Sequence, residues 1–200
     1  MKLIGITGGI GAGKSVVSQI IKSTGLKVYD SDREAKRLIN QSAVIREKLI
    51  SLFGAEVYLS NGIINKPLLA NAIFSNEEMR LRVNSIVHPV VCGDIKEWYN
   101  TLSGRANRVQ FPLCFVESAI LFESGIEQLT SAVIYVDAPE QIRLNRILKR
   151  DNTVAFEAIK RIESQHEIDS LNRSKSDYII NNDETALLTP QVYDVLVMLH

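Results

Sequence analysis

The chain has 200 residues, and its 23 lysines and arginines balance its 23 aspartates and glutamates. This balance excludes the long-range positive field with which many proteins recruit nucleic acid or an anionic membrane. No apolar stretch approaches the roughly 18 residues of a membrane span, so we expect a cytoplasmic, single-domain protein whose partners are small molecules. The sequence does not reveal the oligomeric state.

The first predicted element is a buried strand, Leu3 to Ile6, followed directly by a glycine-rich segment. This segment satisfies the P-loop pattern G-x-x-x-x-G-K-[ST], and a helix is predicted from about Lys14 to Ser23. Backbone amides of such a loop wrap phosphate, Lys14 adds a positive charge, and the Ser15 hydroxyl is a ligand for Mg²⁺. A simple turn is the alternative, but the lysine, the hydroxyl and the strand-to-helix context argue against it. The predicted nucleotide-binding residues are Gly8, Gly9, Ile10, Gly11, Ala12, Gly13, Lys14, Ser15 and Val16.

A second strand, Lys27 to Tyr29, is predicted next, and a helix from about Ser31 to Gln41 follows it. Two acids, Asp30 and Asp32, stand at this junction, where a carboxylate could accept the proton of an attacking hydroxyl. The same residues also fit a capping box in which Ser31 caps the helix. The pattern alone leaves both interpretations open.

From Ile45 to about Leu102 the sequence predicts helices and no convincing strand, with turn signals at residues 60–62, 66–67 and 88–89. We interpret this region as a helical insertion. A histidine before proline, as in His88-Pro89, is more often structural than functional, because proline pushes its predecessor out of the helical conformation.

Strands are predicted again over Val109 to Val116 and Ala132 to Val136, and an acid follows each of them. Glu117 and Asp137 are therefore both candidates for the carboxylate that holds Mg²⁺ through water at the end of a strand. We prefer Glu117, because Asp137 precedes a predicted helix and could serve as its cap.

The segment from Arg143 to Arg161 is rich in basic residues at helical spacing. Arg143, Arg146, Lys149 and Arg150 could share one helix face, and a turn at residues 151–153 leads into a second helix. Two helices joined in this way could form a lid whose arginines cover the phosphates. A solvated basic face is an equally good interpretation, and the spacing does not decide whether Arg143 faces inward.

The last predicted strand is Tyr178 to Ile180, and a helix from about Gln191 to Met198 ends the chain. Alternating strands and helices indicate an α/β fold, a doubly wound parallel sheet with a helical excursion between its second and third strands. Asn181, after the last strand, could contact the adenine of a nucleotide or belong to a turn.

Together these residues resemble the dephospho-CoA kinase family. The residues that carry the resemblance are Thr7 to Ser15, Asp30-Ser31-Asp32, His88-Pro89, Leu121-Phe122-Glu123, Arg146, Arg150-Asp151, Gln165 and Asp177 to Asn181. The resemblance implies transfer of the γ-phosphate of ATP to the ribose 3′-hydroxyl of dephospho-CoA, with Mg²⁺. It also implies that Asp32 is the base, that Arg146 and Arg150 act from the lid, and that His88 lies in the substrate region. Glu117 stands where the family often has an aspartate, which leaves its place near Mg²⁺ open.

The resemblance further implies a P-loop kinase domain in three parts. We expect a nucleotide-binding core over 1–44, 106–138 and 166–200, a helical substrate region over 45–105 and a lid over 139–165. Two other functions are compatible with the P-loop alone: a kinase for a different small alcohol, and a nucleotide-dependent switch. The helical insertion argues against the first, and an acceptor base with a basic lid would be superfluous in the second.

Overall fold

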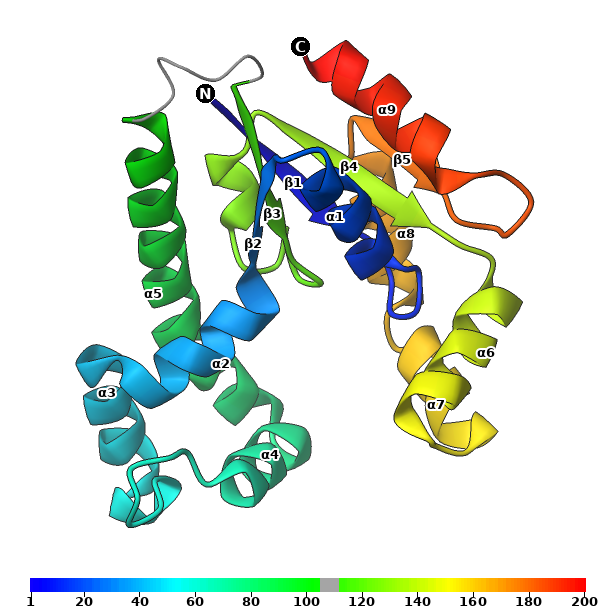
Figure 1. Ribbon diagram of the computed structural model, residues 1–200. Coiled ribbons are helices and arrows are strands. Elements are labelled where there is room, and N and C mark those ends of the chain that lie inside the picture. Colours follow the sequence, from blue (N-terminus) through cyan, green and yellow to red (C-terminus); the bar gives the residue numbers. More distant parts are fainter. Residues whose placement is uncertain (105–111) are drawn as a thin grey trace. The chain divides into compact units, whose positions relative to one another are not determined.

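The computed structural model describes residues 1–104 and 112–200, without the side chains of residues 74 and 75. It forms two compact units, which Figure 1 traces by colour. We call Met1–Tyr29 with Thr101–His200 the sheet unit and Asp30–Asn100 the helical unit. Positions 109–111 of the predicted strand Val109 to Val116 lie outside the described residues. The predicted division by function into core, substrate region and lid stays a prediction.

The sheet unit contains a sheet of five strands in the order β2-β3-β1-β4-β5. The strands are β1 (Lys2–Thr7), β2 (Lys27–Asp30), β3 (Leu113–Glu117), β4 (Ala132–Asp137) and β5 (Tyr178–Asn181). β1 is parallel to β3 and to β4, and β4 is parallel to β5. The chain therefore begins at the central strand β1, goes to one edge at β2 and reaches the other edge last at β5, which confirms the predicted doubly wound α/β fold.

The strand register aligns the carboxyl ends of the neighbouring strands. Ile6 of β1 pairs with Glu117 of β3, and Asp137 of β4 pairs with Asn181 of β5. The glycine-rich loop after β1 consequently lies at the same edge of the sheet as Glu117, Asp137 and Asn181. In open parallel sheets this edge is where ligands bind.

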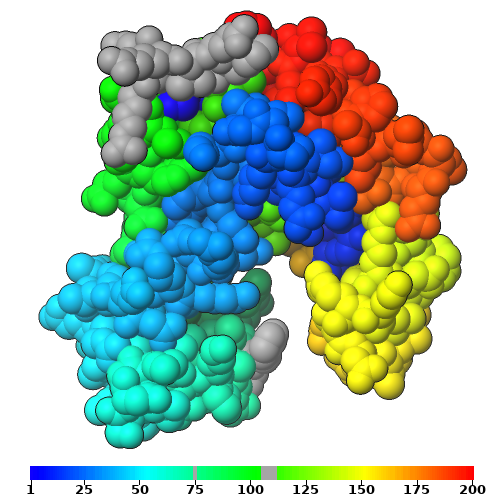
Figure 2. All heavy atoms as spheres, in the orientation of Figure 1, coloured from blue at the N-terminus to red at the C-terminus, as the bar shows by residue number. Residues whose placement is uncertain are grey.

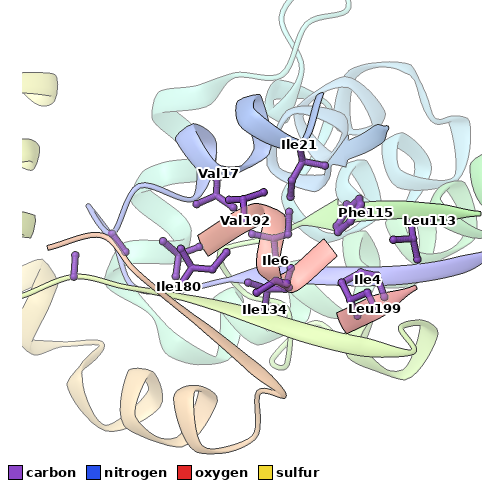
Figure 3. Packing of buried hydrophobic residues seen from close by; sticks show 14 residues of the cluster. Ile4, Ile6, Val17, Ile21, Leu113, Phe115, Ile134, Ile180, Val192 and Leu199 are labelled. Atoms are coloured by element: carbon purple, nitrogen blue, oxygen red, sulfur yellow. The ribbon is translucent and has the colours of Figure 1, made fainter. Parts of the chain in front are cut away.

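Helices α1 (Lys14–Ser23) and α9 (Leu188–Leu199) pack on one face of the sheet, and α8 (His166–Ser174) lies behind β4 in Figure 1. Buried side chains from the strands, α1 and α9 form the main core (Figure 3). Those labelled there are Ile4, Ile6, Val17, Ile21, Leu113, Phe115, Ile134, Ile180, Val192 and Leu199. The three central strands, β1, β3 and β4, are apolar along nearly their whole length because helices cover both faces of the sheet.

Helices α6 (Glu140–Asp151) and α7 (Ala155–Glu163) follow β4, while the short helix η3 (Ile126–Leu129) precedes it. Ile147, Ala158 and Ile162 form a small separate core between α6 and α7. The turn between the two helices is fastened by Asp151, whose carboxylate accepts hydrogen bonds from Arg150 and Arg161. The pair has the form that the sequence predicts for a lid.

The helical unit is built from α2 (Ser31–Gln41), α3 (Ala43–Phe53), η1 (Ala55–Val57), α4 (Lys66–Ser75) and α5 (Glu77–Ser103), whose last residues extend into the sheet unit. Tyr58 and Ile64 form an isolated antiparallel bridge across the predicted turn at residues 60–62. The predicted turn at His88-Pro89 is wrong, because α5 continues through Pro89. Val83, Val87, Val91 and Ile95 make a buried stripe on both sides of the proline, and this packing outweighs the one helix hydrogen bond that proline removes.

The start of α2 differs from the predicted capping box. Asp30, not Ser31, is the N-cap: its carboxylate accepts a hydrogen bond from the Arg33 amide at 2.9 Å. Ser31 is already helical and buried, and Glu34 pairs with Arg33 and Arg37 instead of reaching back. The helix begins at Ser31, as predicted, so only the capping residue differs, and Asp32 lies in the first turn.

Within the described residues, no helix is both long enough and apolar enough to cross a membrane.

Candidate active site

The glycine-rich loop makes a sharp path from the end of β1 to the start of α1. Gly8, Gly11 and Gly13 have φ values of 148°, 80° and 96°, in the region that side chains rarely adopt. Gly13 is the N-cap of α1 and provides no side-chain cap, so the positive end of this helix is left for an external anion. The Nζ atom of Lys14 donates hydrogen bonds to the carbonyl oxygens of Gly8, at 2.7 Å, and Gly9, at 3.3 Å. The positive charge of Lys14 and the backbone amides at the start of α1 therefore lie at the same loop.

Gly8 also permits a close approach between the loop and β4. A Cβ atom at this position would lie 2.3 Å from the carbonyl oxygen of Val136, which is backbone and cannot rotate away. We therefore expect Gly8→Ala to destabilise the protein more than Gly25→Ala.

Gly25 is a matched control, because its φ of +89° is also left-handed but a Cβ atom there would meet nothing within 4 Å. Gly25→Ala should cost only the left-handed strain, roughly 1–2 kcal/mol. Urea unfolding of both variants measures the difference. Equal losses would mean that the contact with Val136 does not constrain the loop.

Arg146 of α6 reaches the loop directly. Its guanidinium donates hydrogen bonds to the carbonyl oxygens of Gly11 and Ala12, at 3.4 and 3.3 Å, and to the Asn182 side-chain oxygen at 3.1 Å. It also pairs with Glu184 at 3.0 Å. In Figure 2 the dark blue surface of the loop adjoins the yellow surface of this helix pair. Arg146 thus contacts the glycine-rich loop, and its role at the phosphates stays a prediction.

Arg143, left undecided by the sequence, points inward. Its side chain is 11% exposed and pairs at 2.8 Å with Asp169 of α8, which is 15% exposed. Burial raises the pKa of the Asp169 carboxyl above its ordinary value, and the charge of Arg143 opposes that shift. The Arg143 Nε atom also donates a hydrogen bond to the carbonyl oxygen of Ile10 at 2.9 Å.

Arg150 lies at the far end of α6 and is 61% exposed, with its guanidinium bound to Asp151. The basic residues of α6 therefore do not share one environment: Arg143 and Arg146 contact the loop, whereas Arg150 fastens the turn. A role for Arg150 in catalysis stays a prediction.

Asn182, which directly follows β5, contacts the glycine-rich loop. It is buried, and its side-chain amide donates a hydrogen bond to the carbonyl oxygen of Ala12 at 2.7 Å. The backbone of Asn181 is instead bound to Gln191. Asn181 lines a cavity of about 210 Å³ together with Asp137, Ala138, Pro139 and Asp183.

The two candidate magnesium acids differ in their surroundings. Asp137 does not cap α6, whose N-cap is Pro139; its carboxylate accepts a hydrogen bond from Arg173 at 2.9 Å. Glu117 ends β3 at the same sheet edge as the loop, and Ser15 is exposed in the first turn of α1. Over the part of the chain that the structure describes, no three acids, histidines or cysteines gather to hold a metal. A hydroxyl and a single carboxylate suit Mg²⁺, which keeps waters and phosphate oxygens as further ligands.

Asp32 and His88 lie in the helical unit. Asp32 is exposed in the first turn of α2, and His88 is half-buried in α5. Burial lowers the pKa of His88 below its ordinary value, which favours the neutral imidazole. Roles for both residues in substrate binding stay predictions.

Sequence reasoning missed three residues that contact the loop. Asn182 and Asp169 were given no role, and Gln165 was noted without one, although its side-chain oxygen accepts a hydrogen bond from the Ile10 amide. Only Gln165 had a signal, through the family resemblance, because the others depend on contacts between distant parts of the chain.

Known proteins resemble this chain over nearly its whole length. A family model described as dephospho-CoA kinase matches residues 2–187. A dephospho-CoA kinase of Porphyromonas gingivalis is 43% identical, with 98% of this chain and 93% of the relative covered. The crystal structure of a Thermus thermophilus protein has a TM-score of 0.76 at 29% identity and covers 100% of this chain and 98% of its own. A dephospho-CoA kinase from Campylobacter jejuni has a TM-score of 0.70 at 27% identity, with 98% and 96% covered.

Proposed function

The chain belongs to the dephospho-CoA kinase family, and on this premise we propose that it transfers the γ-phosphate of ATP to the ribose 3′-hydroxyl of dephospho-CoA. The products are coenzyme A and ADP. The observation that carries the proposal is the family match over residues 2–187, which includes both the glycine-rich loop and the helical unit.

The sheet unit binds the triphosphate in this proposal. The amides at the start of α1 and the ammonium group of Lys14 hold the phosphates, and Arg146 adds a second positive charge beside the loop. The loop geometry supports this assignment, because an uncapped helix start and a lysine converge on one edge of the sheet.

The adenine occupies the cavity of about 210 Å³ beside Asn181. Pro139 and Ala138 offer an apolar surface to the ring, and the Asn181 amide can both donate and accept a hydrogen bond. Asn182 contributes from the same strand end by holding the loop carbonyl of Ala12.

The Ser15 hydroxyl and, through water, the Glu117 carboxylate would hold Mg²⁺ together with phosphate oxygens. When bound, the ion neutralises charge on the phosphates. Asp137 is the weaker candidate, because Arg173 already neutralises its carboxylate.

The helical unit supplies the acceptor side of the reaction in this proposal. Asp32 accepts the proton of the ribose hydroxyl as the hydroxyl oxygen forms a bond to the γ-phosphorus, and the bond from that phosphorus to the β,γ-bridging oxygen breaks to release ADP. His88, kept neutral by burial, contacts dephospho-CoA. Support for these roles comes from the family resemblance and from the exposure of Asp32.

The test is ADP release from ATP and Mg²⁺ by the purified protein, with and without dephospho-CoA, with coenzyme A detected by mass. Acceptor-dependent ADP release with stoichiometric coenzyme A is the expected result. Binding of ATP without stimulation by dephospho-CoA would overturn the proposal, and a screen of other small alcohols would then identify the acceptor.

A further inference from the structure

Ile10, at the tip of the glycine-rich loop, is held on three sides by residues that lie far away in the sequence. Its backbone amide donates to the side-chain oxygen of Gln165 at 3.3 Å, and its carbonyl oxygen accepts from the Nε atom of Arg143 at 2.9 Å. Its side chain packs on the small core of Ile147, Ala158 and Ile162. The amide, the carbonyl and the side chain of one loop residue are thus all engaged by residues of the predicted lid.

Asp169 completes this contact from α8. Its carboxylate pairs with Arg143 at 2.8 Å, so the guanidinium is fixed between Asp169 and the loop carbonyl. The pair packs directly on Gly9, where a Cβ atom would lie 2.4 Å from the Oδ2 atom of Asp169 and 2.5 Å from the Cζ atom of Arg143. A side chain at this position would therefore have to displace the Arg143–Asp169 pair.

The first part of the loop, around Gly9 and Ile10, consequently makes different contacts from the last part, around Gly13. The Ile10 amide is hydrogen-bonded to the side-chain oxygen of Gln165. This amide is directed at a protein group, whereas Gly13, the N-cap of α1, makes no side-chain cap hydrogen bond. The Gly9-Ile10 segment, held by these contacts, sets the direction in which the chain enters α1.

We propose that Gln165, Arg143 and Asp169 are positioning residues that hold the Gly9-Ile10 segment against the lid, so that the amides at the start of α1 keep their aim at the nucleotide phosphates. The inference rests on the proposed function for the identity of the nucleotide. It deepens that function by assigning the shape of the phosphate site to three side chains more than 100 residues away, none of which needs to touch ATP.

The test compares Gln165→Leu and Asp169→Asn with two matched controls. Gln141→Leu makes the same change at an exposed position of α6, and Glu167→Gln removes one negative charge from an exposed position of α8. ADP affinity is measured by calorimetry with Mg²⁺, and KM is measured separately for ATP and dephospho-CoA. Thermal unfolding is measured to check that each variant is folded.

We expect each positioning variant to weaken ADP binding and raise KM for ATP about 3- to 10-fold, the range for one lost hydrogen bond. KM for dephospho-CoA should stay near that of the controls, whereas Asp169→Asn is expected to lower the unfolding temperature, because it leaves the buried Arg143 without its carboxylate partner. The double variant should lose less than the product of the two single effects, because both changes release the same segment.

Three outcomes would overturn the inference: unchanged ADP affinity in folded variants, equal increases in both KM values, or fully multiplicative single effects. Should a variant not fold, Arg143→Lys is the substitute, since a single ammonium group cannot reach both Ile10 and Asp169 as the guanidinium does. Wild-type protein without acceptor-dependent turnover would instead count against the proposed function, and the ADP measurement would still test the positioning role.

Discussion

Lys14→Ala is expected to lower kcat/KM by at least about 10²- to 10³-fold, the size of the effect when one preorganised donor to a developing charge is removed. The Nζ atom of Lys14 already lies over the loop, bound to the carbonyl oxygens of Gly8 and Gly9. A nucleotide would exchange these neutral partners for phosphate oxygens, which strengthens the interaction. Both ATP affinity and turnover should therefore fall, and the coupled ADP release assay with calorimetry measures both.

Lys22→Ala is the matched control for this variant. Lys22 lies in the last turn of the same helix and is exposed, so its removal takes away one positive charge without changing the loop. The control should keep wild-type kinetics. A Lys14→Ala enzyme that retained normal kcat/KM would contradict the assignment of the loop as the phosphate site.

The sheet could be predicted from the sequence because its signals are local. Each strand core is a short apolar run, and the run over Leu113 to Val116 is fully buried in the structure. The glycine-rich loop was equally clear, since its glycines with positive φ, its lysine and its hydroxyl are adjacent in the chain. Where the chemistry of a site is contained in one segment, the sequence is sufficient.

Helix α5 was not predictable in the same way. The turn expected at His88-Pro89 follows correctly from the local preferences of proline, but the buried stripe that includes Val87 and Val91 keeps the helix intact. The cap of α2 shows a smaller version of this problem: Asp30 and Ser31 are both good N-caps, and only the extended backbone at Asp30 decides between them. Where local propensity allows more than one structure, tertiary packing decides which of them forms.

The lid demonstrates why spacing alone does not assign a site. Arg143, Arg146 and Arg150 have helical spacing, yet the small differences in direction along α6 send them to Asp169, to the loop and to Asp151. The contact of Asn182 with Ala12 joins residues 170 positions apart. No local pattern encodes such a contact, because it depends on where β5 ends relative to β1.

The acid that accepts the proton can be identified by comparing two neighbours. Asp32→Asn is expected to lower kcat by about 10²- to 10⁴-fold, the usual contribution of a general base. ATP affinity should change little, because the substitution removes a charge from the helical unit and leaves the glycine-rich loop untouched. Turnover by ADP release and ATP affinity by calorimetry measure the two effects separately.

Asp30→Asn is the informative comparison, because asparagine is as good an N-cap as aspartate and preserves the start of α2. This variant removes a carboxylate two residues away without disturbing the helix, so it should keep most of the activity. The opposite ranking, with Asp30→Asn inactive and Asp32→Asn active, would identify Asp30 as the general base. Because both variants remove one negative charge from the same turn, only a direct role in proton transfer can separate their kcat values by orders of magnitude.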